Sequence, residues 1–182
     1  EAMRQRDAIY RLSSIVELDG GVFGKKQTGN QAEVLVAIET KNWIDNKGRK
    51  KSGAGFAKVV VANETKKNAQ AFVDIAIEEG AMLNTDGSPS FIHLEHMDVD
   101  YQVTGNKQKV IDHWLPWIHK FISNAKSWIV GTHHGVEAKY LGTYLSEYTF
   151  RFNRRHDPDS LFFRILGACV NAEPKTSQVL LR

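Results

Sequence analysis

Four side chains stand where their types and spacing would let them act together on a phosphate ester. Asp19 lies in a strand-like run whose period of two places Glu17 and Asp19 on one face, and Asp86 follows a second short apolar run. His119 and Lys126 lie seven residues apart in a helical stretch, about two turns, so both project from one side. Two carboxylates and a helix-borne ligand can hold a pair of divalent cations such as Mg²⁺ or Mn²⁺. Such a pair clamps the attacking and the leaving oxygen of an in-line phosphoryl transfer.

Each of these residues also has an ordinary structural interpretation. A single Asp on a strand is often a turn former or an ion-pair partner, and Thr85-Asp86-Gly87 is a common turn sequence. His119 lies among apolar and aromatic residues, so a hydrogen-bonded core histidine is the alternative for it. Glu137, beyond the end of the same helix, is the rival candidate for a third acidic ligand. The order and spacing of the four residues together favour a site.

The elements that must position these residues follow from hydrophobic periodicity and turn signals. Strands are predicted at 14–23, 33–40, 57–62, 81–84 and 98–103. Helices are predicted at 1–12, 66–79, 113–131 and 137–153. Residues 45–55 are expected to form a basic, glycine-rich loop.

The connections between these elements predict the topology. Short links join the first three strands, which suggests an antiparallel meander, and a strand that follows a crossover helix adds in parallel. We therefore expect an α/β fold: a ribonuclease-H-like (retroviral-integrase-like) mixed five-stranded sheet, flanked by helices, with strand order 3-2-1-4-5. In that order the first and fourth strands are adjacent, so Asp19 and Asp86 would lie side by side.

Composition bounds the class of protein. The 182 residues predict one domain, and 42% hydrophobic with 25% charged residues argue against long disorder or a collagen-like repeat. No apolar run approaches the ~20 residues that a membrane span needs, so no membrane partner is expected. Cys169 is the single cysteine, which excludes an internal disulfide and a cysteine-based zinc site, and its apolar neighbours predict burial.

The basic residues are clustered although the net charge is only +3. The clusters that we predict to contact DNA phosphates comprise Lys25, Lys26, Lys47, Arg49, Lys50, Lys51, Arg151, Arg154 and Arg155. The alternative is that they are solvated loops and a helix end.

Four motifs, in this order, resemble a known family. They are Ser14-Ile15-Val16-Glu17-Leu18-Asp19 with Gly21-Val22-Phe23-Gly24; Thr85-Asp86-Gly87; Trp117-Ile118-His119, Ser123-Asn124-Ala125-Lys126 and Gly131-Thr132-His133-His134-Gly135; and Tyr148-Thr149-Phe150-Arg151-Phe152-Asn153-Arg154-Arg155. Together they resemble the ISXO-like family of bacterial insertion-sequence transposases of the DDE type. The resemblance covers about residues 3–156.

The resemblance implies a role for each residue of the site. Asp19 and Asp86 match the two metal-binding acids, and His119 followed by Lys126 matches a variant that has His at the third position and Lys seven residues on. Asp19, Asp86 and His119 would hold two Mg²⁺ or Mn²⁺ ions, and Lys126 would contact a phosphate near the scissile bond. The family often has an acidic residue directly after the first Asp, where this chain has Gly20.

The resemblance also implies an activity, partners and a domain plan. The activity is that of a DNA transposase: cleavage at transposon ends and strand transfer into target DNA, with double-stranded DNA as partner. The domain would act as a homodimer or larger assembly on DNA, in the bacterial cytoplasm and associated with the nucleoid. The alternatives are an inactive or domesticated DNA-binding relative and a ribonuclease-H-like nuclease of another kind.

Three segments are expected along the chain. Residues 1–13 form an N-terminal helix leading from an upstream region, 14–156 the catalytic domain, and 157–182 an extension or tail. The family usually carries an N-terminal zinc ribbon, which is expected upstream of Glu1 or has been lost.

Overall fold

A computed structural model describes residues 1–24, 29–102 and 114–173 of the chain. The strands of this part are β1 (Ile15–Phe23), β2 (Ala32–Ile44), β3 (Lys50–Val61), β4 (Met82–Thr85) and β5 (Asp98–Tyr101). The helices are α1 (Ala2–Asp7), α2 (Lys66–Ala76), α4 (Pro116–His133), α5 (Ala138–Phe152) and α6 (Leu161–Val170).

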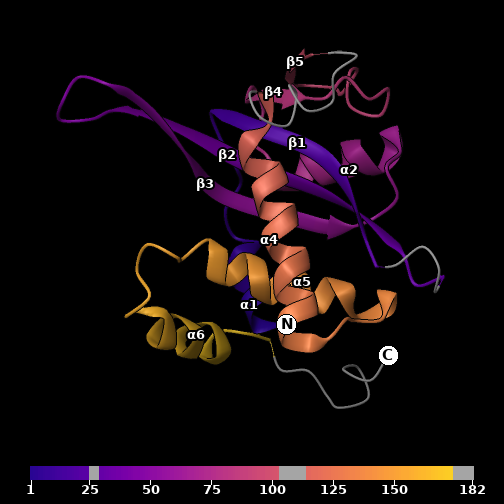
Figure 1. The fold of residues 1–182 in the computed structure, drawn as a ribbon, viewed down its shortest axis with the longest axis vertical. Coiled ribbons are helices and arrows are strands. Elements are labelled where there is room, and N and C mark those ends of the chain that lie inside the picture. The colour runs from indigo at the N-terminus through magenta and orange to yellow at the C-terminus, as the bar shows by residue number, and fades with distance from the viewer. Residues whose placement is uncertain (25–28, 103–113, 174–182) are drawn as a thin grey trace.

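The five strands form one mixed sheet in the order β3-β2-β1-β4-β5 (Figure 1). β1 pairs with β2 and β2 with β3 in antiparallel fashion, whereas β1 pairs with β4 and β4 with β5 in parallel. The α2 crossover separates β3 from β4, which is why β4 can add beside β1 in parallel. The predicted strand order and the ribonuclease-H-like fold class are confirmed.

Helices cover both faces of the sheet and bury two apolar cores. On one face, Leu35 and Ala37 of β2 pack toward α2. On the other face, Val34, Val36 and Ile38 pack with residues of α4 and α5. Alternate residues of one strand therefore enter different cores, which explains why the apolar run of β2 is nearly continuous. Each fully buried Val, Leu or Ile side chain contributes ~1.5–3 kcal/mol.

The segment expected to be a loop at 45–55 is largely a hairpin, and that prediction was wrong. β2 and β3 remain paired to Ile44 and Lys50, and their tip projects from the body of the molecule (Figure 1). Asp45 closes the turn, since its Oδ1 accepts the backbone N–H groups of Lys47 and Arg49, both at 2.9 Å. Main-chain hydrogen bonds between the two strands hold the extension together, so it can form with little apolar content.

Helix boundaries differ from the predicted ones, most at the N-terminus, where α1 ends at Asp7 and not at residue 12. α4 begins at Pro116, whose missing N–H suits the first helical turn, and ends where His134 adopts φ +54°. Residue 113, the predicted start of this helix, lies outside the described residues. α2 ends at Ala76 because Ile77 leaves the helix to form a bridge with Leu12.

α6 was not predicted as a separate element. It packs against α1, and it leaves Phe162, Phe163 and Val170 about 70% exposed or more. Cys169 on this helix is also exposed, so the expectation that it is buried was wrong. α6 meets its neighbours along a narrow line that includes buried Ala168 and half-buried Ile165, and Phe162, Phe163, Leu166 and Val170 are exposed. None of the described helices is both long and apolar enough to cross a membrane.

Candidate active site

The parallel pairing of β1 with β4 brings the two predicted acids together. Glu17 of β1 lies opposite Asn84 of β4, the last pair of this register, and Asp19 and Asp86 each follow two residues later in their chains. Neighbouring strands are ~4.8 Å apart, so the two side chains share one end of the sheet. Asp86 follows the last residue of β4, where its Oδ1 accepts the backbone N–H of Ser88 at 3.0 Å.

Glu17 fixes the start of α4 against β1. Its Oε2 accepts the backbone N–H groups of Trp117 at 2.9 Å and Ile118 at 2.8 Å. The first N–H groups of a helix have no partner within the helix, so a carboxylate from a neighbouring strand satisfies them and also complements the helix dipole. Thr40 Oγ1 donates to the other Glu17 oxygen at 3.2 Å. Glu17 thereby sets the position of the residue that follows, His119.

His119 faces the first acid across this junction. Its Nε2 lies 3.7 Å from Asp19 Oδ2. Further along, a side chain at Gly21 would meet Ile122 of α4, so glycine there lets the helix approach the strand closely. β1 and α4 thus lie side by side, and the β1 residues that face the helix, Glu17, Asp19 and Gly21, meet it one after another along its length.

Lys126 lies on α4 near the other end of β1. It is exposed, and its Nζ lies 5.5 Å from the centre of the Phe23 ring. Seven residues of helix rise about 10 Å, so Lys126 sits well along the helix from His119. The structure therefore brings His119 to Asp19, leaves Asp86 exposed beyond the end of β4, and places Lys126 farther along α4.

The charges of this region oppose the ionisation of Asp19. Burial, and then the negative charge of Asp86, raise the pKa of Asp19 to about 7, although the N–H of Gly20 donates to its Oδ1 at 2.7 Å. The charges of Glu64 and Glu17 act in the same direction. Burial lowers the pKa of His119 below its usual value against the opposing effect of Asp86, so the imidazole is neutral at pH 7.

The donor set fits a divalent cation by its chemistry. Two carboxylates and a neutral imidazole are ligands that Mg²⁺ or Mn²⁺ accepts, and a cation would favour the ionised form of Asp19, which burial and the charge of Asp86 oppose. Over residues 1–24, 29–102 and 114–173, no three His, Cys, Asp or Glu side chains converge tightly enough to hold an ion as they stand. Asp86, which is exposed, would have to close on Asp19 and His119 for the set to be complete.

The sequence analysis did not identify Glu64 and Ser88, which the structure adds to this region. Glu64, between β3 and α2, accepts a hydrogen bond from Ser88 Oγ at 2.6 Å through its Oε1. Its Oε2 fills the space that a side chain at position 20 would need. The signal in the sequence was Gly20 itself, a glycine in mid-strand directly after a candidate catalytic acid.

The rival third acid, Glu137, lies elsewhere. It precedes the first residue of α5 and its carboxylate forms an ion pair with Lys139 Nζ at 2.9 Å. Both side chains are largely exposed.

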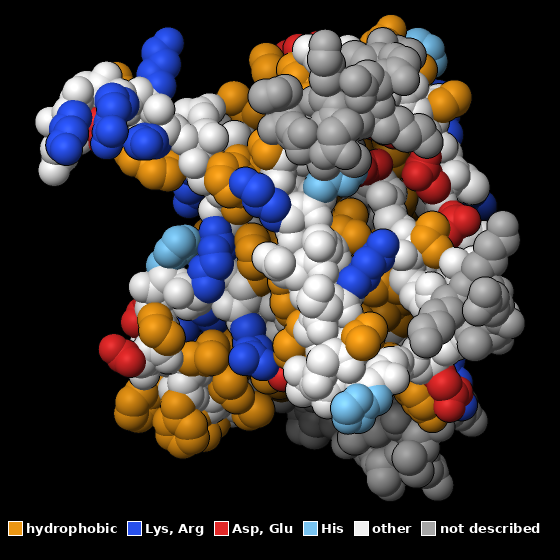
Figure 2. Space-filling model, in the orientation of Figure 1, with side chains coloured by type: hydrophobic (Ala, Val, Ile, Leu, Met, Phe, Trp, Pro, Cys, Tyr) orange, Lys and Arg blue, Asp and Glu red, His pale blue; other side chains and the backbone are white. Residues whose placement is uncertain are grey.

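The predicted DNA contacts fall into separate regions. Lys25 and Lys26 lie outside the described residues. The tip of the β2–β3 hairpin is covered with basic side chains (Figure 2), and its exposed members include Lys47, Arg49, Lys50 and Lys51. Arg151, on α5, is exposed and lies 3.6 Å from Glu147.

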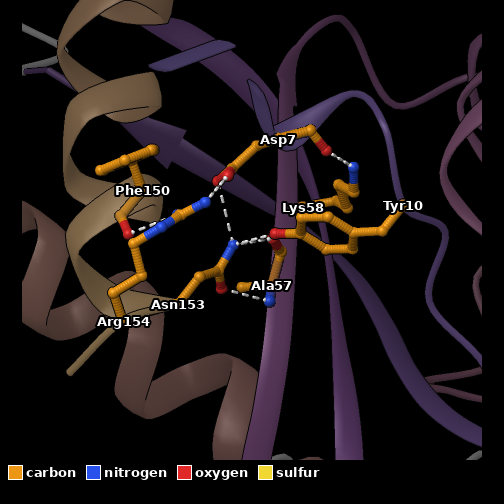
Figure 3. A network of polar contacts seen from close by, with 7 residues as sticks. All are labelled: Asp7, Tyr10, Ala57, Lys58, Phe150, Asn153 and Arg154. Atoms are coloured by element: carbon orange, nitrogen blue, oxygen red, sulfur yellow. Dashed lines mark hydrogen bonds and ion pairs between the residues drawn. The ribbon is translucent and has the colours of Figure 1, made fainter. Parts of the chain in front are cut away.

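Arg154 and Arg155 have partners within the chain. The Arg154 guanidinium lies 2.7 Å from Asp7 Oδ1, and its side chain is only 10% exposed (Figure 3). Arg155 donates to the backbone carbonyls of Ala54 and Gly55 and lies over the Phe152 ring at 4.0 Å. These contacts give both side chains a structural role, and their contact with DNA stays a prediction.

Asn153 is the centre of this second polar region. Its side chain accepts the N–H of Ala57 at 2.7 Å and donates to the carbonyl of Ala57 at 3.0 Å, to Asp7 and to Tyr10 (Figure 3). The Phe-Asn-Arg-Arg ending noted in the sequence therefore ties the end of α5 to β3 and α1.

Comparison with known proteins bears on this arrangement. No curated protein matches the chain. A family model, that of the ISXO2-like transposase domain, matches residues 12–153, more than three quarters of the chain. The match includes Asp19, Asp86, His119 and Lys126 as well as Asn153, and DDE transposases generally use divalent metal ions. With its five-stranded mixed sheet and a family model that matches residues 12–153, the chain belongs to the family of ISXO2-like transposase domains.

Proposed function

We propose that the domain catalyses metal-dependent cleavage of DNA at transposon ends and strand transfer into target DNA. The observation that carries the proposal is the 3.7 Å approach of His119 Nε2 to Asp19 Oδ2 beside Asp86, within a chain of this family. In the first step a water oxygen attacks phosphorus and the bond to the 3′ oxygen breaks. In the second step the freed 3′-hydroxyl attacks a phosphodiester of the target and displaces its 3′ oxygen.

Each residue of the site has a proposed task. Asp19, Asp86 and His119 would hold two Mg²⁺ or Mn²⁺ ions, which when bound lower the pKa of the attacking water and stabilise the leaving oxygen. Burial lowers the pKa of His119, which would favour the neutral imidazole needed to offer Nε2 to a metal, and Asp19 would have to be ionised to bind one. Lys126, exposed about 10 Å along α4 from His119, would contact a DNA phosphate near the scissile bond.

The β2–β3 hairpin is the proposed arm that grips double-stranded DNA. Its tip carries Lys47, Arg49, Lys50 and Lys51, and Trp43 beside them is 51% exposed. Phosphate contacts of this kind bind all sequences alike. We further propose that the domain acts as a homodimer or larger assembly on transposon ends and target, on the bacterial nucleoid in the cytoplasm.

A cleavage assay tests the catalytic part of the proposal. His119→Ala should abolish Mg²⁺- or Mn²⁺-dependent nicking and leave DNA binding nearly intact, and His119→Glu should retain nicking because it supplies a carboxylate. Nicking is normalised to folded protein by circular dichroism. Glu137→Gln is the matched control and should cut as the unaltered protein does. Full nicking by folded His119→Ala would remove His119 from the site, and DNA binding without nicking in the unaltered protein would favour the inactive relative.

A salt titration tests the arm. The pair Lys50→Gln with Lys51→Gln should weaken binding to every DNA sequence and reduce the slope of log affinity against log salt by roughly 2, about 0.9 per lost phosphate contact. The matched control removes two charges elsewhere, with Lys139→Gln and Arg164→Gln on α5 and α6. Equal slopes for both double variants would contradict the arm as the DNA contact.

A further inference from the structure

We propose that Glu64 is a fourth ligand-bearing residue of this site, a carboxylate that reaches the metal-binding acids from the α2 face of the sheet because residue 20 is glycine. The inference rests on the proposed function, since it assigns Glu64 to the same divalent ions. The inference adds to that function a residue that supplies further negative charge to the site.

The backbone around Glu64 is fixed by several hydrogen bonds. Its N–H donates to Glu33 Oε2 at 2.8 Å, and its carbonyl accepts from Ser90 Oγ at 3.3 Å. The next residue, Thr65, caps α2 by accepting the N–H of Asn68 at 3.2 Å. The side chain therefore starts from a defined point between β3 and α2.

One residue connects the Glu64 carboxylate to the second acid of the site. Ser88 Oγ donates to Glu64 Oε1 at 2.6 Å, while the Ser88 N–H donates to Asp86 Oδ1 at 3.0 Å. Glu64 and Asp86 are thus held by the two donors of a single residue. Both carboxylates are exposed to solvent, so an ion can reach them.

Gly20 gives the carboxylate its place. A methyl group at residue 20 would overlap Glu64 Oε2 and lie 3.1 Å from its Cδ. The φ angle of Gly20 is not in the left-handed region, so the backbone itself does not require glycine there. Because the N–H of Gly20 also donates to Asp19 Oδ1 at 2.7 Å, this one residue contacts both acids. What glycine provides at position 20 is room for Glu64 beside Asp19.

The charge of the site gives Glu64 a task. Two divalent ions bring four positive charges, and a neutral imidazole at the third position contributes no negative charge. Asp19 and Asp86 supply two. The carboxylate of Glu64 would supply a third negative charge, the same charge that a glutamate in place of His119 would supply.

Mn²⁺ binding by isothermal titration calorimetry tests the inference on the full chain, without DNA. Glu64→Gln keeps the size of the side chain and an oxygen that accepts from Ser88, so it removes only the charge. We expect it to weaken Mn²⁺ affinity at least ~10-fold, the size typical of losing a group that supports a metal site. Asp74→Asn, which removes one exposed charge from α2, is the matched control and should leave affinity unchanged.

Moving the carboxylate sharpens the test. Gly20→Asp alone should crowd Glu64 and lower thermal stability. Combined with Glu64→Ala, the same change returns a carboxylate to the same space, and Mn²⁺ affinity should recover to within ~3-fold of the unaltered protein, a difference of only about 0.6 kcal/mol. This double variant also answers the question if Glu64→Gln folds poorly.

The outcomes separate the inference from the proposed function. If Glu64→Gln binds Mn²⁺ as the unaltered protein does while Asp19→Asn loses it, Glu64 has only a structural role and the proposed function stands. Failure of the double variant to regain affinity also overturns the inference. If the unaltered protein binds Mn²⁺ no better than Asp19→Asn, both the inference and the proposed metal-dependent function fail.

Discussion

Two buried aspartates, Asp7 and Asp19, are nearly equal in exposure at 8% and 7%, yet their surroundings differ. Asp7 receives the Arg154 guanidinium at 2.7 Å and the Asn153 amide at 3.2 Å. Asp19 accepts only the backbone N–H of Gly20, His119 Nε2 lies 3.7 Å from it, and the charges of other acids act on it. One carboxylate is neutralised by the fold, and the other is left short of positive charge.

The difference is the one expected between a structural acid and the metal-binding acid proposed for Asp19. A buried charge is costly unless it is paired and hydrogen-bonded, so the protein satisfies Asp7 within itself. No such partner offsets the cost of burying a charge on Asp19, and a bound cation would reduce that cost. Burial alone does not separate the two roles, and the charge of the neighbours does.

Asp19→Asn is expected to have the largest effect. Replacing the carboxylate by an amide should reduce Mg²⁺- or Mn²⁺-dependent nicking to background. Without metal at pH 7.5 it should raise the free energy of unfolding, because the negative charge of Asp19, which the neighbouring acids repel, is gone. Nicking assays and urea titrations measure the two effects. Lower stability with nicking retained would place Asp19 with Asp7 among the structural acids.

Asp7→Asn should show the reverse behaviour. Removing one partner of a buried ion pair costs ~3–5 kcal/mol because the Arg154 charge is left unpaired. Nicking per folded molecule should be unchanged, because the network lies around the end of α5 and not at His119. Urea titration gives the stability, and specific activity on the folded fraction is the control. A loss of nicking in folded protein would mean that the two regions are coupled.

The pH dependence of stability should reveal the strained acid. The pKa of Asp19 is about 7 in the folded state and near its ordinary value of 3.8 when unfolded, so the folded state binds the extra proton. Stability without metal is therefore highest at acid pH and falls as pH rises toward 7, by about 2–3 kcal/mol between pH 5 and pH 7 from Asp19. Thermal unfolding measures this fall, and Asp19→Asn should remove the Asp19 share.

Glu17 contributes to the same fall. Burial raises its pKa to about 7, against the hydrogen bonds from α4 and Thr40. A slope that Asp19→Asn leaves unchanged would show that Asp19 ionises freely.

Glu17→Leu should have the smallest effect on stability and still reduce activity. Losing the acceptor for the Trp117 and Ile118 N–H groups costs about 1 kcal/mol, as other helix caps do. His119 then loses its fixed position opposite Asp19, so nicking should fall while DNA binding persists. Glu17→Gln keeps an acceptor and should retain most of the nicking. Equal nicking by both variants would limit Glu17 to a structural role.

The sequence predicted the part of the site that depends on strand order and periodicity. Asp19 and Asp86 follow from a parallel pairing that the crossover helix dictates, and His119 from the spacing within one helix. Gly20 indicates that something approaches β1 there, but it does not identify Glu64, which lies 44 residues away in the chain and comes from the α2 face of the sheet.

The basic residues show the same limit. Arg154 and its partner Asp7 are separated by 147 positions in the chain, so no local pattern distinguishes this buried arginine from its exposed neighbour Arg151. The hairpin extension was not predicted because pairing through main-chain hydrogen bonds leaves little periodic signal in the sequence. α6 was not predicted because many of its apolar side chains face outward.

β2 passes from the centre of the sheet into the arm, and this continuity has a consequence for amide hydrogen exchange. Its residues Val34–Ile38 are fully buried between two helical layers, whereas Asn42–Ile44 are exposed and pair only with β3. Amides of the first group can exchange only when the whole domain opens, and those of the second exchange through local fraying. A single strand therefore joins a deeply buried base to an exposed tip, so amide exchange should change from slow to fast along β2 between Ile38 and Asn42.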